Sequence, residues 1–309
     1  MKRWSGVNGV RMGARIQIGF LFILGVLLLA GPLALAGVVR FPDAGLEAAI
    51  REAISKPTGS IYDYHLDEIE ILDASARGIA SLEGLESCTA LAEVNLEDNR
   101  IEDLTPLESL HHLSVLNLSG NAISDLGPLQ ALENLTRLLL GENSLVDLSP
   151  FLAFESIQAL EELELHGNFI ADISPLSGLQ FLTRLTLQDN EIADLESLSG
   201  LGSLVSLNLS NNEIERIDVL AGLGELKILL LEGNRIRDIR ALSGLENLFG
   251  LWLGNNLIED LTPLASNVGI GYMDRIYICG NPLDSSPSSS ATAVLDTLTL
   301  RGAFVYDCP

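Results

Sequence analysis

Aromatic, cysteine and basic residues are scarce in this chain of 309 residues. Aromatics make up 5% of it although 47% is hydrophobic, so a large core has to be built mostly from aliphatic side chains. The three cysteines and four histidines show no metal-ligand spacing. Only 18 Lys and Arg stand against 42 Asp and Glu, a formal net charge of −24. Such an acidic surface excludes nucleic acid as a partner, because the phosphates would be repelled.

The N-terminus has the pattern of a targeting segment. A basic start is followed by an apolar run over residues 16–36 that ends in Ala34-Leu35-Ala36, a small-x-small cleavage site. The pattern predicts a signal peptide over residues 1–36. The run, about 21 residues long, could also cross a bilayer, so an uncleaved N-terminal anchor remains an alternative. Both place the rest of the chain outside the cytoplasm, either secreted or at the cell surface.

One asparagine returns at nearly constant spacing along most of the chain. Successive members are 22 or 25 residues apart, with an aliphatic residue three positions before and two positions after each of them. The nine positions are Asn99, Asn121, Asn143, Asn168, Asn190, Asn212, Asn234, Asn256 and Asn281. The unit LxxLxLxxNxIxDLxPLxxLxx predicts leucine-rich repeats over residues 66–283, in about ten coils of 22–25 residues.

Each repeat is predicted to form a short strand, a turn and a tight helical piece. Stacked coils give an α/β fold, a curved right-handed horseshoe with a parallel β-sheet on its concave face. The asparagine should sit in the turn and pair with backbone groups of its own and neighbouring coils. Thr105-Pro106, Ser149-Pro150, Ser174-Pro175 and Thr262-Pro263 predict a capping hydroxyl before a proline at the first helical position.

Aspartates recur four residues after most of the asparagines. They are Asp103, Asp125, Asp147, Asp172, Asp194, Asp238 and Asp260, with Arg216 as the exception. A row of carboxylates could attract Ca²⁺, but the ligand spacing of a calcium loop is missing. We therefore expect them to accept local backbone hydrogen bonds, and no metal site or cofactor is predicted.

Both ends of the solenoid need caps. Residues 37–65 predict an N-terminal helical cap in which Asp43 starts a helix with an apolar stripe of Leu46, Ile50, Ala53 and Ile54. Residues 284–309 predict a small C-terminal cap with a helix and a strand. Cys88 falls in a leucine column and is expected to be a core thiol. Cys279 and Cys308 are candidates for a disulfide that closes the last coil.

With its NxIxDLxPL units and a helical cap before "GLESCTAL", the chain resembles bacterial internalin-type leucine-rich repeat proteins over about residues 38–309. The resemblance implies an extracellular solenoid that binds another macromolecule on its concave face. The sequence shows no LPxTG sorting signal, C-terminal membrane span or Ig-like domain. Wall anchoring and host invasion are therefore not carried over.

Concave positions alternate with the core leucines, and their residues vary from coil to coil. An apolar group gathers in the C-terminal third, Ile228, Leu230, Trp252 and Tyr277, with Arg275 beside it. Exposed aromatic clusters mark interfaces, so we expect a binding surface here. The alternative is that Trp252 and Tyr277 pack under the C-terminal cap. A second candidate is a central polar patch of Glu162, Glu164, His166, Arg184 and Gln188, for which the alternative is plain solvated residues.

No GxSxG, Walker or paired-carboxylate signature is present, so an enzyme is not expected. The sequence predicts an extracellular binding module, a monomer, that recognises a protein, or second a glycan, on its concave face. The alternative is a structural cell-envelope or adhesion component without a specific ligand, which would show an evenly polar concave face.

Overall fold

The computed structural model describes residues 37–153 and 159–307. The signal peptide or anchor predicted over residues 1–36 lies outside this range. Within it, no helix combines the length and the hydropathy that crossing a bilayer requires.

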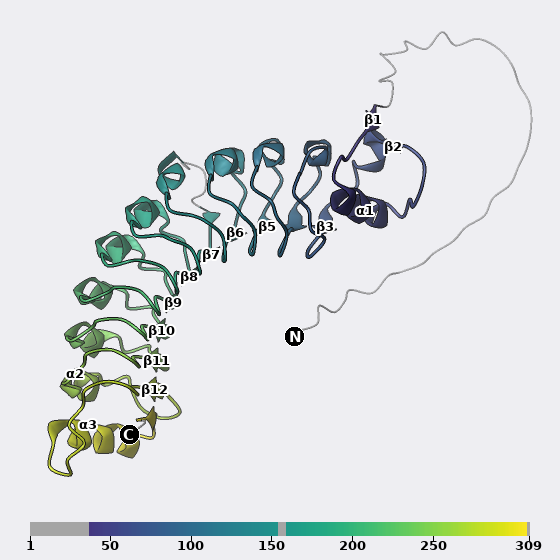
Figure 1. Ribbon diagram of the computed structural model, residues 1–309. Coiled ribbons are helices and arrows are strands. Elements are labelled where there is room, and N and C mark those ends of the chain that lie inside the picture. The colour runs from purple at the N-terminus through teal and green to yellow at the C-terminus, as the bar shows by residue number, and fades with distance from the viewer. Residues whose placement is uncertain (1–36, 154–158, 308–309) are drawn as a thin grey trace, which may run out of the picture. The chain divides into compact units, whose positions relative to one another are not determined.

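A single parallel sheet of eleven strands runs through the solenoid, in the order β13 to β3. Successive coils are in register, so that Leu207, Leu229 and Leu251 are direct partners. The strands line the inner side of the curve and the helical pieces lie on its outer side (Figure 1). This confirms the predicted leucine-rich repeat fold. The strands are β3 (Ile71–Asp73), β4 (Glu93–Asn95), β5 (Val115–Asn117), β6 (Arg137–Leu139), β7 (Glu162–Glu164), β8 (Arg184–Thr186), β9 (Ser206–Asn208), β10 (Ile228–Leu230), β11 (Gly250–Trp252), β12 (Arg275–Tyr277) and β13 (Phe304–Tyr306).

The outer segments of the coils are mostly single turns of 3-10 helix. A coil of this length leaves few residues for its outer side, and a 3-10 helix covers more distance per residue than an α-helix. A short α-helix, α2 (Thr262–Ser266), forms in the last coil, where the asparagine spacing is 25. The 3-10 helices are η2 (Leu85–Ser87), η3 (Thr105–Leu107), η4 (Gly127–Ala131), η5 (Ser149–Ala153), η7 (Ser174–Gly178), η8 (Glu196–Gly200), η9 (Asp218–Gly222) and η10 (Arg240–Gly244).

The core is one continuous aliphatic column along the axis of the solenoid. Leu116, Leu118 and Ile123 show how a coil contributes to it: the strand, the turn and the segment after the turn each bury an aliphatic side chain completely. A coil cannot bury these side chains by itself, so neighbouring coils stabilise each other.

The repeated asparagines tie each coil to the one before it. The side-chain amide of Asn212 donates to the carbonyls of Leu209 in its own coil, at 3.0 Å, and of Leu187 in the preceding coil, at 2.9 Å. Its Oδ1 atom accepts from the backbone N–H of Ile192 at 2.9 Å. The other eight asparagines of the row make the corresponding bonds. We call this row the asparagine ladder.

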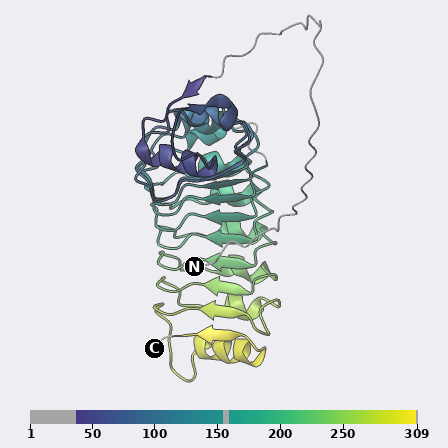
Figure 2. The same ribbon diagram turned by 90° about the vertical axis from the view of Figure 1, so that its right-hand side faces the viewer.

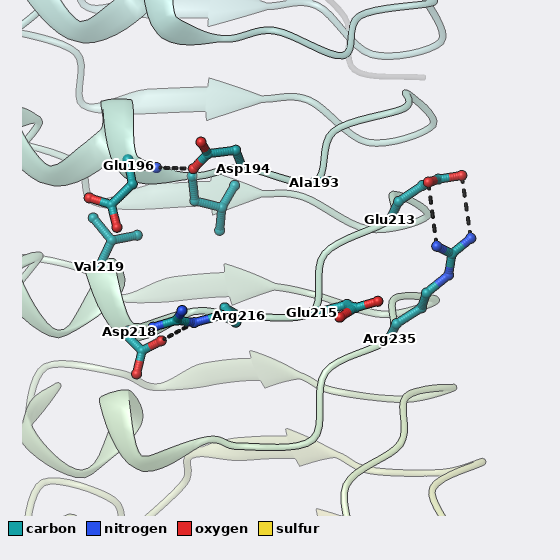
Figure 3. A pocket seen from close by; sticks show the side chains of 10 residues that line it. Ala193, Asp194, Glu196, Glu213, Glu215, Arg216, Asp218, Val219 and Arg235 are labelled. Atoms are coloured by element: carbon teal, nitrogen blue, oxygen red, sulfur yellow. Dashed lines mark hydrogen bonds and ion pairs between the residues drawn. The ribbon is translucent and has the colours of Figure 1, made fainter.

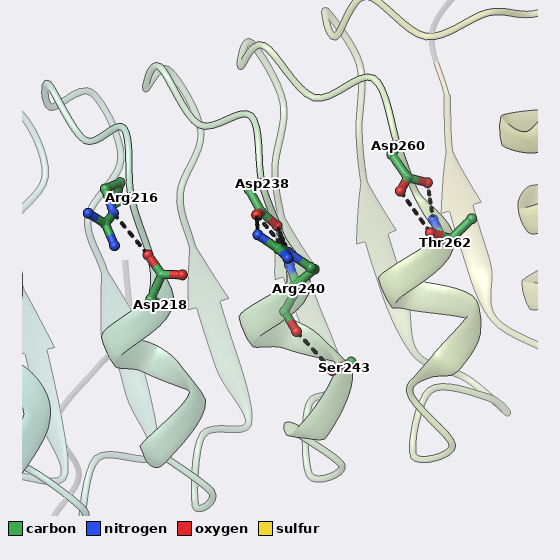
Figure 4. A network of polar contacts seen from close by, with 7 residues as sticks. All are labelled: Arg216, Asp218, Asp238, Arg240, Ser243, Asp260 and Thr262. Atoms are coloured by element: carbon green, nitrogen blue, oxygen red, sulfur yellow. Dashed lines mark hydrogen bonds and ion pairs between the residues drawn. The ribbon is translucent and has the colours of Figure 1, made fainter.

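The recurrent aspartates cap the outer helices. The carboxylate of Asp260 accepts from the backbone N–H and from the hydroxyl of Thr262, both at 2.8 Å (Figure 4). Asp103, Asp125, Asp147, Asp172, Asp194 and Asp238 likewise accept the N–H two residues ahead. The predicted hydroxyl caps are wrong, because Thr105, Ser174 and Thr262 are the first helical residues and the carboxylate before each takes the capping role. In the exceptional coil, Arg216 pairs with Asp218 (Figure 4).

The N-terminal cap consists of a two-stranded antiparallel ribbon, a helix and a 3-10 turn. They are β1 (Val38–Val39), β2 (Ile61–Tyr62), α1 (Ala44–Ala53) and η1 (Asp63–His65). Asp43 is the N-cap of α1 and also accepts from the N–H of Ala80 at 2.9 Å, which joins the cap to the first coil. Leu46, Ala49 and Ile50 are the buried face of α1. Ala53 is exposed, so its predicted place in the apolar stripe is wrong.

The C-terminal cap consists of α3 (Ser290–Leu300) and β13, and it lies at the far end of the solenoid (Figure 2). The α3 helix buries Ala291, Val294 and Leu298, and β13 extends the main sheet by pairing with β12. Cys279 is disulfide-bonded, whereas Cys88 is a buried free thiol. The expected partner, Cys308, lies outside the described residues.

Candidate functional site

The concave face changes character along the solenoid. The first and third residues of each strand lie on this side. The middle residue is buried in β3 to β12 and half-buried in β13. In β10, β11 and β12 these outward positions hold Ile228, Leu230, Trp252, Arg275 and Tyr277. Leu230, Trp252 and Tyr277 are direct partners in register, so the predicted apolar residues are neighbours on adjacent strands.

Three aromatic rings form a continuous stack across the last strands. The ring centroids of Trp252 and Tyr277 are 4.9 Å apart with an interplanar angle of 9°. Those of Tyr277 and Tyr306 are 4.3 Å apart with an angle of 5°. We call Trp252, Tyr277 and Tyr306 the aromatic stack. Parallel rings at these distances stabilise one another beyond the area that they bury.

A glycine provides the space for the first ring. A Cβ atom at Gly250 would lie 2.7 Å from Cζ3 of Trp252, so the indole lies directly over the backbone of its own strand. Any larger residue at this position would displace the indole and with it the start of the aromatic stack.

Tyr306 was not among the predicted site residues. It belongs to the C-terminal cap, 29 positions after its register partner Tyr277 and without an asparagine to mark its coil. A signal was nevertheless present, because the pattern Tyr-x-Cys occurs at Tyr277 and again at Tyr306.

The two interpretations of Trp252 and Tyr277 both describe part of the geometry. Tyr277 does pack on a ring of the C-terminal cap, and burial, followed by the hydrogen bond and the charge of Tyr306, raises the pKa of the Tyr277 phenol. The stack nevertheless stays at the surface: Trp252 and Tyr277 are half-buried and Tyr306 is 42% exposed. The rings cover each other's faces, and all three stay partly accessible to solvent.

The central polar patch is held together by ion pairs. Glu162 lies between two arginines, 2.7 Å from Nε of Arg137 and 3.1 Å from Nη1 of Arg184. Burial, with a contribution from the charge of Glu162, raises the pKa of Glu164. The charged residues of the patch therefore pair with one another, unlike the separate solvated side chains of the alternative. Arg137 also belongs to the patch, although the sequence did not single it out.

The same patch holds an imidazole over a glycine. A Cβ atom at Gly141 would lie 2.1 Å from Cε1 of His166, so the ring occupies the space above this backbone. Gln188 is on the neighbouring coil and is half-buried. Strand β9 separates the patch from the apolar residues of β10 to β12.

A hollow of about 500 Å³ lies away from the concave positions, on the segments between the asparagine turns and the outer helices (Figure 3). Its charged side chains largely satisfy one another: Arg235 pairs with Glu213, and Arg216 with Asp218. The remaining carboxylates, Glu196 and Glu215, are acidic like most of the surface and bring no group of a different chemistry into the hollow. Among residues 37–153 and 159–307 no group of three or more His, Cys, Asp or Glu side chains is placed to hold a metal ion.

The chain matches two profiles of the leucine-rich repeat families. The profile "Leucine rich repeat" matches residues 182–236. The profile "Leucine Rich repeats (2 copies)" matches residues 89–132, 158–200 and 225–266. A comparison with curated protein sequences gives no significant match.

Three solved structures from Listeria monocytogenes resemble the chain. Internalin C2 is 34% identical with a TM-score of 0.65, over 68% of this chain and 92% of that protein. Internalin F is 27% identical with a TM-score of 0.58, over 87% and 91%. The functional domain of InlJ is 25% identical with a TM-score of 0.67, over 81% of this chain and 53% of that one. The repeats, the caps and these likenesses agree: the chain belongs to the internalin-like leucine-rich repeat proteins, a non-enzymatic family of protein-interaction modules.

Proposed function

We propose that the chain is an extracellular binding module that recognises a protein partner on the C-terminal third of its concave face. The aromatic stack carries the proposal, together with Leu230, the register partner of Trp252, and Ile228, the register partner of Gly250. Tyr and Trp are the residues most enriched at the energetic centres of protein interfaces.

The composition of this surface fits a protein partner. Half-buried aromatic rings on a rigid sheet lose little conformational entropy on binding, since their positions are already fixed by stacking and by the space over Gly250. Arg275 is exposed beside Tyr277 and offers a guanidinium to a carboxylate or carbonyl at the rim of the contact.

A glycan fits less well. A sugar ring binds by stacking on an open aromatic face, but both faces of the central ring, Tyr277, are covered by Trp252 and Tyr306, so only the two end rings could offer one. A structural component without a ligand also fits less well, because it gives no reason for an apolar cluster on an otherwise mostly polar concave face.

The proposal is tested by joint replacement of Trp252 and Tyr277 with Ala. A partner is first identified by capture from an extracellular protein extract on the immobilised wild-type chain, and its affinity is then measured for each variant. Loss of one central ring weakens a protein interface about 30-fold or more. The double variant loses two rings, so its affinity for the partner should fall by more than this factor. The control is Phe181→Ala, an aromatic of similar size that is 59% exposed outside the strands.

A second variant protects the test against a folding defect. Ile228→Asp adds a charge to the surface and replaces none of the three stacked rings. It should also weaken binding while leaving the thermal transition near that of the wild type. If the partner binds both concave variants as well as it binds Phe181→Ala, the proposed surface is wrong.

A further inference from the structure

The main sheet ends differently at its two edges. At the N-terminal edge, α1 packs against β3, and β3 itself carries an outward-facing Asp73. At the C-terminal edge, α3 packs against β13, but among the described residues β13 pairs with β12 alone, and its sequence is Phe-Val-Tyr. Open edges of natural sheets are usually protected by charge, proline or a covering element. The three residues of β13 contain neither a charge nor a proline, and the nearest charge is that of Asp307, which follows the strand.

The backbone of Val305 faces away from the sheet. The N–H of Phe304 donates to Asp274 at 2.7 Å and the carbonyl of Tyr306 accepts from Ile278 at 3.0 Å, so both groups point towards β12. Backbone groups alternate in direction along a strand. The N–H and C=O of Val305 are therefore presented at the open edge.

The side chains around Val305 are self-complementary. Phe304 and Tyr306 flank it on the concave side and are 49% and 42% exposed. If two β13 strands pair antiparallel about Val305, the two valines exchange both hydrogen bonds, and each Phe304 lies opposite the Tyr306 of the other copy. Aromatic pairs of this kind stabilise a sheet.

The strand that would pair carries no charge of its own. The chain has a net charge of −24, which makes most pairs of its surfaces repel each other. Phe304, Val305 and Tyr306 are uncharged, and Asp284 and Asp307, the acids at the two ends of the C-terminal cap, lie outside β13. Exposed apolar side chains accompany the strand: Leu300 is 89% exposed and Tyr272 is 81% exposed.

From these observations we infer that the protein forms a two-fold dimer, in place of the monomer expected from the sequence, in which β13 of one copy pairs antiparallel with β13 of a second copy. The pairing joins the two sheets edge to edge. Phe304 of each copy then covers the outer face of Tyr306 in the other, which adds a fourth ring to each aromatic stack. Both concave faces point to the same side, so a dimer can bind two partner molecules or two sites on one partner.

Proline at position 305 tests the backbone pairing. Val305→Pro removes the outward N–H but no bond to β12, and proline is tolerated on an edge strand when its N–H side faces solvent. The full chain should be dimeric in analytical ultracentrifugation over a concentration series. Two equivalent hydrogen bonds are lost in Val305→Pro, so its dissociation constant should rise about tenfold or more.

A charge swap tests the register. Phe304→Lys with Tyr306→Lys places like charges opposite each other twice and should give a monomer. Phe304→Glu with Tyr306→Lys places opposite charges together only in the antiparallel register, and should restore the dimer. Both variants lose the same ring from the aromatic stack, so the comparison isolates the contact between copies.

Circular dichroism and the thermal transition confirm that each variant is folded. A wild-type chain that remains monomeric at every concentration overturns the inference. A dimer that is insensitive to all three variants, or two charge variants that dimerise equally, also overturns it, because the contact would then lie elsewhere.

Discussion

The asparagine ladder gives the sharpest prediction for stability, and Asn212→Ala in the middle of the solenoid is the perturbation. The structure separates what this change removes. The carbonyls of Leu187, Leu209 and Ser210 lose the amide of Asn212 but each keep a second donor. These donors are the side chains of Asn190 and Asn234 and the N–H of Asp189. The N–H of Ile192 loses its partner, since Oδ1 of Asn212 is the acceptor that it uses.

The magnitude follows from this count. A buried donor without a partner costs about 1–3 kcal/mol, and a hydrogen bond whose acceptor keeps another donor about 0.5–1.5 kcal/mol. With one unpaired donor and three lost bonds of the second kind, partly relieved by relaxation, Asn212→Ala should lower the free energy of unfolding by about 2–6 kcal/mol.

Urea unfolding followed by circular dichroism measures this loss. The control is Asn208→Ala in the same coil, whose side chain lies on the concave surface and accepts a single bond, from the N–H of Ser210 at 3.1 Å. The control should change stability by no more than about 1 kcal/mol. If the two variants unfold at the same urea concentration with the same slope, the ladder does not hold the coils together as described.

Three further predictions concern single sites. Gly250→Ala should displace the indole of Trp252, shift its fluorescence emission and weaken partner binding, whereas a wild-type spectrum would contradict the packing over Gly250. The hydroxyl and the backbone N–H of Thr105 donate to Asp103, and the backbone N–H and the hydroxyl of Ser174 donate to Asp172. These bonds lower the pKa values of the two carboxyl groups. A lowered carboxyl pKa stabilises the fold above the unfolded value, so stability should fall as the pH drops through the folded pKa, and Asp172→Asn should lessen this fall in acid unfolding curves. Burial, with a smaller effect of Glu86, raises the pKa of Cys88 to about 12, so iodoacetamide at pH 8 should modify it only after unfolding.

The scaffold could be predicted from the sequence because its determinants are repeated. Nine asparagines and two aliphatic columns recur in the same phase, so they define the register of the strands. A strand placed one residue off in one coil would no longer align with the asparagine and the aliphatic residues of the next coil. The same repetition predicted which residues face outwards, and Trp252 and Tyr277 lie side by side for that reason.

The parts that escaped prediction depend on contacts between unlike segments. Tyr306 completes the aromatic stack from a strand that has no asparagine, so the repeat could not place it. Gly250 and Gly141 carry no side chain, and their role emerges only from the rings of Trp252 and His166 above them. Thr-Pro and Ser-Pro are common cap signals, which is why the sequence predicts hydroxyl caps. In the structure the aspartate two residues earlier accepts the N–H of Thr105 or Ser174 itself, so these residues begin the helix and do not cap it.

Hydrogen–deuterium exchange of the chain with and without its captured partner tests the central claim most directly. The account predicts slower exchange on binding in β10 to β13, and little change in the outer helices η8 to η10. Slower exchange confined to those outer helices, or to β3 to β5, would contradict recognition by the C-terminal third of the concave face.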